Sequence, residues 1–180
     1  MTNQSLDGRN IAVLATNGFE QSELETPVEV LKAAGARVDV ISLKEGEIQG
    51  MEHDKVGRKV KVDRALSSVK ASDYDALVLP GGVANPDKLR TDAAAVEFVQ
   101  SFSQASKPIA AICHGPWPLI NAEAIDGRKM TSWPSLEADL RNAGAQWVDQ
   151  EVVVDRGVIT SRKPNDLPAF CTKMISEFAA

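Results

Sequence analysis

Cysteine and histidine are scarce in this chain of 180 residues, which has two of each. Cys113 and Cys171 lie far apart in the sequence, and the four residues show none of the spacings of a structural zinc site. We therefore expect neither a structural disulfide nor a bound metal. Each cysteine is then either a small buried apolar residue or a chemical reagent.

Long apolar runs are absent as well, since none approaches the roughly 20 residues that span a bilayer. The first ten residues, MTNQSLDGRN, lack the basic-then-apolar layout of a signal peptide. The net charge of −5 argues against nucleic acid or an anionic membrane as the main partner. With 43% hydrophobic and 25% charged residues, the composition is that of an ordinary globular protein, and we expect it in the cytoplasm.

Short apolar runs alternate with amphipathic stretches along the chain. The patterns predict strands over 10–16, 37–43, 76–82 and 108–113, short strands over 45–63, and a hairpin over 151–161. They predict helices over 24–36, 92–105, 115–125, 135–145 and 165–179. Because there is no repeat and no linker, we expect one α/β domain over 1–180, with a polar tail over about 1–9. Its sheet should be mostly parallel, with helices on both faces.

Three predicted strands end in unusual residues, in the segments NGFEQSE, PGGVANPD and CHGP. The carboxyl ends of parallel strands meet at one edge of a sheet, where binding sites gather. The sequence therefore predicts one crevice that contains Glu20, Glu23, Gly81, Gly82, Cys113 and His114.

The segment IAAICHGP indicates a sharp turn from a buried strand into a helix, with Cys113 at the turn. Such a turn holds its residue in a strained conformation with the side chain exposed, and Gly115 removes a Cβ that would crowd it. We expect the N-terminus of the next helix to lower the pKa of the thiol. Backbone N–H groups at Gly115 and at the Gly81-Gly82 turn are candidates to bind an oxyanion. The alternative is a buried structural cysteine.

Candidate partners for the thiol lie close to it in the sequence or in the predicted crevice. His114 is adjacent, and the turn must swing its imidazole back toward the sulfur if the two are to cooperate. A protonated glutamic acid could donate a hydrogen bond to the sulfur, and Glu20, Glu23 and Glu25 compete for this role. A histidine that only caps the turn, and glutamates that only face solvent, remain the alternatives.

Six segments in order make the chain recognisable: FEQSELETPVEVLKAAG, DALVLPGG, NPDKLR, AAICHGPWPLI, MTSWPSLEADLRNAGA and VVVDRGVITSRKPNDLPAF. Together they resemble the PfpI family, the branch of the class I glutamine amidotransferase-like superfamily that includes intracellular peptidases, general stress proteins and deglycases. The resemblance extends from about residue 10 to 178.

The resemblance implies a flavodoxin-like α/β sandwich with Cys113 as nucleophile, His114 beside it and Glu23 in contact with the sulfur. It also implies that Asp87 reaches across an interface to the histidine of a neighbouring subunit, so that the site is complete only in a homodimer or a larger assembly of dimers. No cofactor is implied.

Three functions are consistent with such a site in a stress-response protein. The preferred one is a cofactor-free glyoxalase or protein deglycase that acts on methylglyoxal, glyoxal or their adducts on protein side chains. The alternatives are an intracellular cysteine peptidase, and a redox sensor or chaperone in which Cys113 is oxidised. All three require a reactive cysteine, so the sequence leaves them open.

Overall fold

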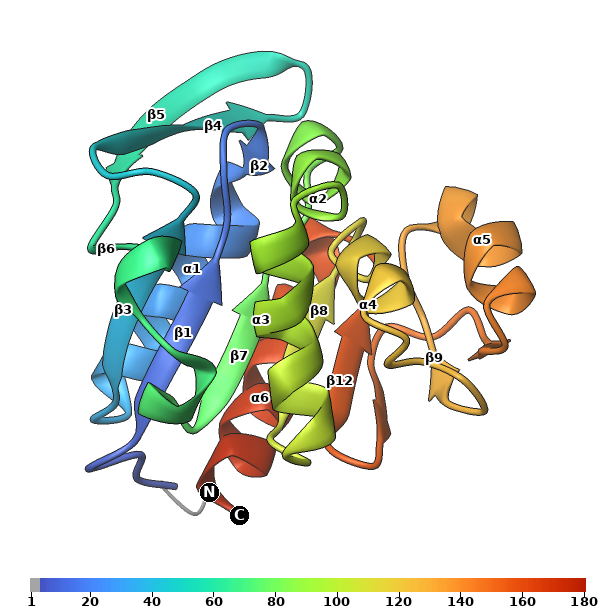
Figure 1. Ribbon diagram of the computed structural model, residues 1–180. Coiled ribbons are helices and arrows are strands. Elements are labelled where there is room, and N and C mark those ends of the chain that lie inside the picture. Colours follow the sequence, from blue (N-terminus) through green and yellow to red (C-terminus); the bar gives the residue numbers. More distant parts are fainter. Residues whose placement is uncertain (1–3) are drawn as a thin grey trace.

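The computed structural model describes residues 4–180, and its centre is a seven-stranded sheet in the order β11-β12-β8-β7-β1-β3-β6 (Figure 1). Every neighbouring pair in this sheet is parallel except β11 and β12. The strands are β1 Asn10–Leu14, β3 Arg37–Ser42, β6 Arg64–Ala65, β7 Ala76–Leu79, β8 Ile109–Ile112, β11 Val153–Asp155 and β12 Val158–Ser161.

Helices cover both faces of the sheet, as Figure 1 shows with α3 in front of the strands and α1 and α6 behind them. The two faces of the sheet are apolar because successive strand residues point to opposite sides. In β1, Ala12 and Leu14 join the core on the side of α3, while Ile11 and Val13 join the core on the side of α1 and α6. The helices are α1 Gln21–Ala33, α2 Ala84–Leu89, α3 Ala93–Gln104, α4 Trp117–Asn121, α5 Glu137–Asn142 and α6 Leu167–Ala179.

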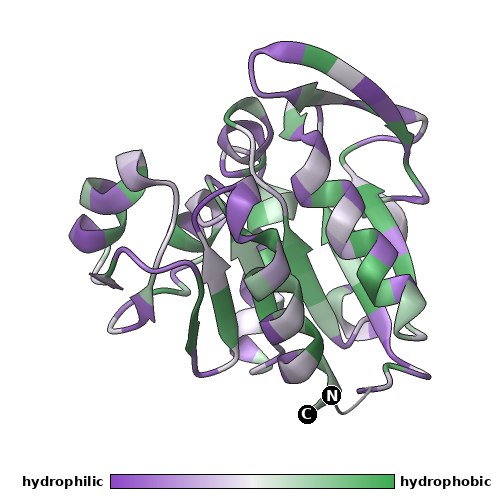
Figure 2. Cartoon of the chain, turned by 180° about the vertical axis from the view of Figure 1, so that it is seen from behind, coloured by the Kyte–Doolittle hydropathy of each residue, from purple (hydrophilic) through white to green (hydrophobic). Residues whose placement is uncertain are grey.

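This arrangement confirms the predicted three-layer α/β sandwich with a mostly parallel sheet. In Figure 2 the strands of the sheet are largely green, the colour of hydrophobic residues, whereas the helices carry both hydrophobic and hydrophilic residues. Strands that are buried on both faces read as near-continuous apolar runs, which is why their positions could be predicted.

Two smaller sheets lie beside the main one. The segment predicted to contain short strands forms an antiparallel pair, β4 Glu47–Glu52 and β5 Lys55–Lys61. β4 also pairs in parallel with the short strand β2 Phe19–Glu20, which gives a three-stranded sheet. A second pair, β9 Lys129–Met130 and β10 Gln146–Trp147, is parallel. The β4–β5 hairpin projects beyond the carboxyl edge of the main sheet (Figure 1).

Two expectations need correction. The helix predicted over 115–125 is shorter: α4 begins at Trp117 and ends at Asn121. Of the expected polar tail, residues 1–3 lie outside the described residues, and Leu6 is fully buried, with its N–H bonded to the Ala34 carbonyl. The single-domain organisation over 1–180 stays a prediction.

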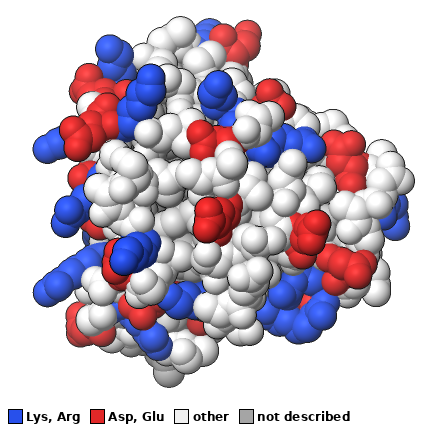
Figure 3. Space-filling model, viewed as in Figure 1, with Lys and Arg blue, Asp and Glu red and all other residues white. Residues whose placement is uncertain are grey.

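The surface seen in Figure 3 carries acidic and basic side chains interspersed, without a broad region of one sign. In the part of the chain that the structure describes, no helix has the length and apolar character needed to cross a membrane.

Candidate functional site

Cys113 lies at the sharp turn that follows β8, and its backbone is left-handed, with φ of +62°. This conformation is strained for a residue with a side chain. The turn is held by a hydrogen bond of 2.8 Å from the Gly115 N–H to the Ile112 carbonyl. A Cβ at Gly115 would overlap the Leu79 carbonyl oxygen, so only glycine fits there. The strained turn predicted from the sequence is therefore present, but the expected exposure of its side chain is wrong, because Cys113 is only 7% exposed.

The turn brings His114 back to the sulfur. The Cys113 Sγ and His114 Nδ1 atoms are 3.1 Å apart, and both side chains are buried. The imidazole lies between two tryptophans, edge-on to Trp117 and stacked with Trp133. Burial lowers the pKa of His114, which favours the neutral imidazole. In the tautomer with its proton on Nε2, Nδ1 can accept the thiol proton.

Of the three competing glutamates, Glu23 is the one beside the sulfur. It lies in the first turn of α1, is 0% exposed, and accepts the Gly81 N–H through Oε2 at 3.0 Å. Its Oε1 is buried without a hydrogen-bond partner of normal geometry among residues 4–180. Burial raises the pKa of Glu23 to about 8, with Glu20 adding a smaller upward effect. Glu23 is therefore protonated at neutral pH and can donate a hydrogen bond, as expected for a carboxyl next to a thiol.

The expectation of a lowered thiol pKa is wrong. Burial raises the pKa of Cys113, the charge of an ionised Glu23 raises it further, and the N–H groups of His114 and Gly82 lower it only in part. The helix expected to stabilise the thiolate has only five residues and starts at Trp117. Because protonated Glu23 carries no charge, its repulsion is absent at neutral pH, and His114 is the base positioned to take the proton.

The expected oxyanion donors are only partly available. The Gly81 N–H is bonded to Glu23 and the Gly115 N–H to Ile112, so neither is free. The N–H groups that face the sulfur are those of Gly82 and His114. Gly82 has φ of +76°, and a Cβ there would overlap the Gly18 carbonyl oxygen.

A cavity of about 480 Å³ opens above Cys113 at the carboxyl edge of the sheet. Its volume falls in the range of small-molecule sites. Glu20 accepts the His53 N–H at 3.0 Å, which joins the β4–β5 hairpin to the cavity wall. The cavity is lined by Gly18, Glu20, Glu23, Met51, His53, Gly82, Val83, Ala84, Cys113, His114, Trp133, Lys163, Pro164 and Asn165. Of the six residues predicted to share one crevice, all but Gly81 line this cavity, and Trp133 lines it as well.

Asp87 is not part of this cavity. It is exposed on α2, the helix that starts at Ala84. The third competing glutamate, Glu25, forms an ion pair with Arg58 away from the cavity. Within one chain, the structure thus joins Cys113, His114 and Glu23 and leaves Asp87 outside.

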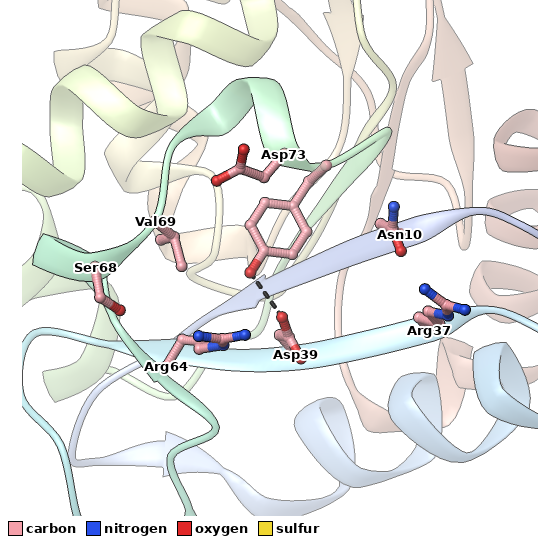
Figure 4. A pocket seen from close by; sticks show the side chains of 8 residues that line it. Asn10, Arg37, Asp39, Arg64, Ser68, Val69 and Asp73 are labelled. Atoms are coloured by element: carbon pink, nitrogen blue, oxygen red, sulfur yellow. Dashed lines mark hydrogen bonds between the residues drawn. The ribbon is translucent and has the colours of Figure 1, made fainter.

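A second cavity, of about 390 Å³, lies beside the outer strands of the sheet (Figure 4). Tyr74 donates a hydrogen bond of 2.7 Å to Asp39 there, and Arg37 and Arg64 lie to either side of that carboxylate. The residues that line it include no cysteine and no histidine. Among residues 4–180, no group of three or more His, Cys, Asp and Glu side chains could hold a metal ion. The cavity above Cys113 is therefore the candidate active site.

Sequence reasoning missed Lys163, Met51 and the loop around Asn165. Lys163 follows β12, the strand paired with β8, so the rule that sites gather at strand ends applied to it as well. Met51 gave no signal, because only the fold brings the β4–β5 hairpin over the sheet edge.

The chain is similar to several named proteins. YraA of Bacillus subtilis (strain 168), provisionally named a cysteine protease, is 47% identical over 163 residues, 90% of this chain and 94% of that protein. General stress protein 18 of the same organism is 46% identical over 165 residues, 91% of this chain and 94% of that protein. Protein/nucleic acid deglycase 2 of Escherichia coli (strain K12) is 44% identical over 164 residues, 90% of this chain and 93% of that protein.

A solved structure and a family model agree with these relatives. The crystal structure of Drosophila melanogaster DJ-1beta superposes with a TM-score of 0.86 at 31% identity, covering 95% of this chain and 90% of that one. The model of the DJ-1/PfpI family matches residues 9–177. The protein belongs to the DJ-1/PfpI family.

Proposed function

We propose that the protein is a stress-response enzyme of the glyoxalase and deglycase type, which acts on methylglyoxal or glyoxal and on their adducts with protein side chains. The observation that carries the proposal is the pair of proton-transfer groups at the sulfur: a protonated carboxyl on Glu23 and a neutral imidazole on His114. Relatives named as a deglycase and a general stress protein support it.

The proposed reaction moves protons around one carbon–sulfur bond. His114 takes the thiol proton as Sγ adds to the aldehyde carbon, and Glu23 or His114 protonates the carbonyl oxygen. A proton then moves from the carbon that carries sulfur to the neighbouring carbonyl carbon, giving a thioester of a 2-hydroxy acid. Water cleaves the thioester and releases the acid, while Cys113 regains its proton.

The stoichiometry explains why no cofactor is required. Methylglyoxal and one water molecule give lactic acid, and an adduct on an amine gives the 2-hydroxy acid and the free amine. Neither conversion consumes an oxidant or a reductant. We infer that the enzyme works without a cofactor, on small carbonyl compounds or modified side chains in the cytoplasm.

The peptidase alternative has support from the name of YraA. Peptide cleavage would use His114 in the same way, first to take the thiol proton and then to give it to the leaving amine, so the imidazole does not separate the two functions. The small-molecule volume of the cavity favours a compact substrate over a peptide chain. A redox-sensor role, in which Cys113 is oxidised beside Glu23, stays a prediction.

We further propose that Asp87 of a second subunit completes the site in a homodimer or a larger assembly of dimers. With Nδ1 at the sulfur, Nε2 of His114 carries its proton and has no hydrogen-bond partner among residues 4–180. Asp87 is exposed on α2, the helix that contacts α4. Its carboxylate could accept a hydrogen bond from the Nε2–H of His114 in the other subunit and so orient the ring.

The test compares substrates. Purified protein, dialysed against a chelator, is assayed for lactate from methylglyoxal, and in parallel for cleavage of unmodified peptides. We expect a higher kcat/KM for methylglyoxal, with no need for added metal or glutathione. Efficient peptide cleavage without lactate formation would refute the proposal in favour of a peptidase.

A further inference from the structure

Lys163 and Cys113 leave neighbouring strands at the same edge of the sheet. β12 ends at Ser161, whose carbonyl accepts the Cys113 N–H at 3.0 Å, and Lys163 follows directly after Arg162. Both Lys163 and Cys113 line the cavity of about 480 Å³. The backbone bond thus sets the lysine and the thiol on one wall of the same site.

The segment that carries Lys163 is held firmly. Arg162 donates to both oxygens of buried Asp166 at 2.9 and 3.0 Å, and to Asp149 at 2.8 Å. The Asp166 N–H in turn bonds the Lys163 carbonyl at 2.9 Å. These contacts fix the backbone on both sides of Lys163, a residue that lines the cavity.

The ammonium group of Lys163 has no counter-charge of its own. Of the described residues that line the cavity, Lys163 alone is a lysine or arginine. No ion pair in the described part of the chain involves it. Two glutamates also line the cavity: Glu20 accepts the His53 N–H and forms no ion pair with Lys163, and Glu23 is protonated at neutral pH. An unpaired, half-buried cation that lines the same cavity as a nucleophile is suited to bind an anionic group of the ligand.

We propose that Lys163 is the carboxylate-binding residue of this site. It holds the carboxylate of the 2-hydroxy acid product, and it favours electrophiles that carry a carboxylate next to the reacting carbon over neutral electrophiles of the same size. This assignment deepens the proposed function, because it names the charged group that the cavity recognises, and it makes Lys163 a determinant of specificity.

Two alkylating agents of nearly equal size test the proposal without any enzymatic turnover. Iodoacetate and iodoacetamide both form a carbon–sulfur bond at Cys113 with loss of iodide, and only iodoacetate carries a carboxylate beside the reacting carbon. Second-order rate constants at Cys113 are measured by peptide mapping for the parent, Lys163→Met, Lys163→Arg and the control Lys44→Met, which removes an exposed lysine that does not line the cavity.

For Lys163→Met we expect the iodoacetate rate to fall about fivefold at low ionic strength and by less at high salt, while the iodoacetamide rate is unchanged. Lys163→Arg should retain the parent ratio of the two rates, and so should Lys44→Met. An unchanged ratio in Lys163→Met would overturn the proposal. An equal fall of both rates would also overturn it, because that result indicates a structural role.

Protection of the Cys113 thiol by lactate tests whether Lys163 binds the carboxylate of the product. Lactate should slow the reaction of Cys113 with iodoacetamide in the parent and in Lys44→Met, and it should protect Lys163→Met at least about fivefold less well. Equal protection of parent and Lys163→Met would contradict the assignment. These outcomes are distinguishable from failure of the proposed function, since neither measurement requires lactate formation from methylglyoxal.

Discussion

Replacing Glu23 by glutamine should remove a pH dependence of stability that this carboxyl imposes on the fold. Burial raises its pKa from the ordinary value of 4.5 to about 8. At about 1.4 kcal/mol for each pH unit, this difference corresponds to an upper bound on the order of 5 kcal/mol in the free energy of unfolding. Glutamine keeps the shape of the side chain and an acceptor for the Gly81 N–H, and it cannot ionise.

The direction in which stability changes with pH follows from the protons that the folded and the unfolded protein bind. Below pH 4.5 Glu23 is protonated in both the folded and the unfolded protein, so its full contribution to the free energy of unfolding is present. Between pH 4.5 and about 8 the unfolded chain loses this proton while the folded protein keeps it, so stability falls as the pH rises. Above about pH 8 the folded protein also ionises, and this contribution is lost.

Urea unfolding at several pH values between 4.5 and about 8 measures this effect for the parent, Glu23→Gln and the control Glu29→Gln, an exposed position on the same helix. We expect the slope of stability against pH to be more negative in the parent and in Glu29→Gln than in Glu23→Gln. The same slope in all three proteins would refute the inference that Glu23 is buried and protonated beside the sulfur.

Three further predictions concern the thiol, the elbow and the subunit interface. Limited iodoacetamide should label Cys113 before Cys171, because Cys113 lines the cavity whereas Cys171 packs in the core on α6; faster labelling of Cys171 in peptide maps would contradict the site assignment. Gly115→Ala should lose at least about 1–3 kcal/mol of stability and the reactivity of the thiol, because its Cβ overlaps the Leu79 carbonyl; a Tm and an alkylation rate equal to those of the parent would show that the turn adapts. Mixing inactive Asp87→Ala and Cys113→Ala subunits should restore part of the lactate-forming activity; no recovery in a verified heterodimer, or a fully active monomer on dilution, would remove Asp87 from the mechanism.

The sequence allowed the sheet and the position of the cavity at its edge to be predicted because both depend on local patterns. The buried strands are short apolar runs, and parallel strands bring their carboxyl ends to one edge. The left-handed conformation of Cys113 could be expected from the glycine that follows it in a strand-to-helix turn. Glu23 itself could be separated from Glu20 and Glu25 only through the family resemblance, since all three lie close together in the sequence.

The electrostatics of the site could not be predicted in the same way. The pKa of Cys113 depends on how deeply the turn is buried and on a carboxyl that comes from α1, and neither is a property of the CHGP segment. From the sequence, the Gly81 N–H was a candidate donor to an oxyanion. In the fold it donates its hydrogen bond to Glu23 instead. Lys163 was overlooked although it follows a strand that ends at the same edge of the sheet, whereas the hydrogen bonds from Arg162 to Asp166 that hold its segment have no sequence signature.

The most direct test of the account is the formation of lactate from methylglyoxal by Cys113→Ala and Cys171→Ala, each compared with the parent after removal of metals. If Cys113 is the nucleophile, Cys113→Ala has no activity above the uncatalysed rate, and Cys171→Ala has the kcat/KM of the parent. Lactate formation by Cys113→Ala at the rate of the parent would contradict the central claim that this thiol carries the reaction.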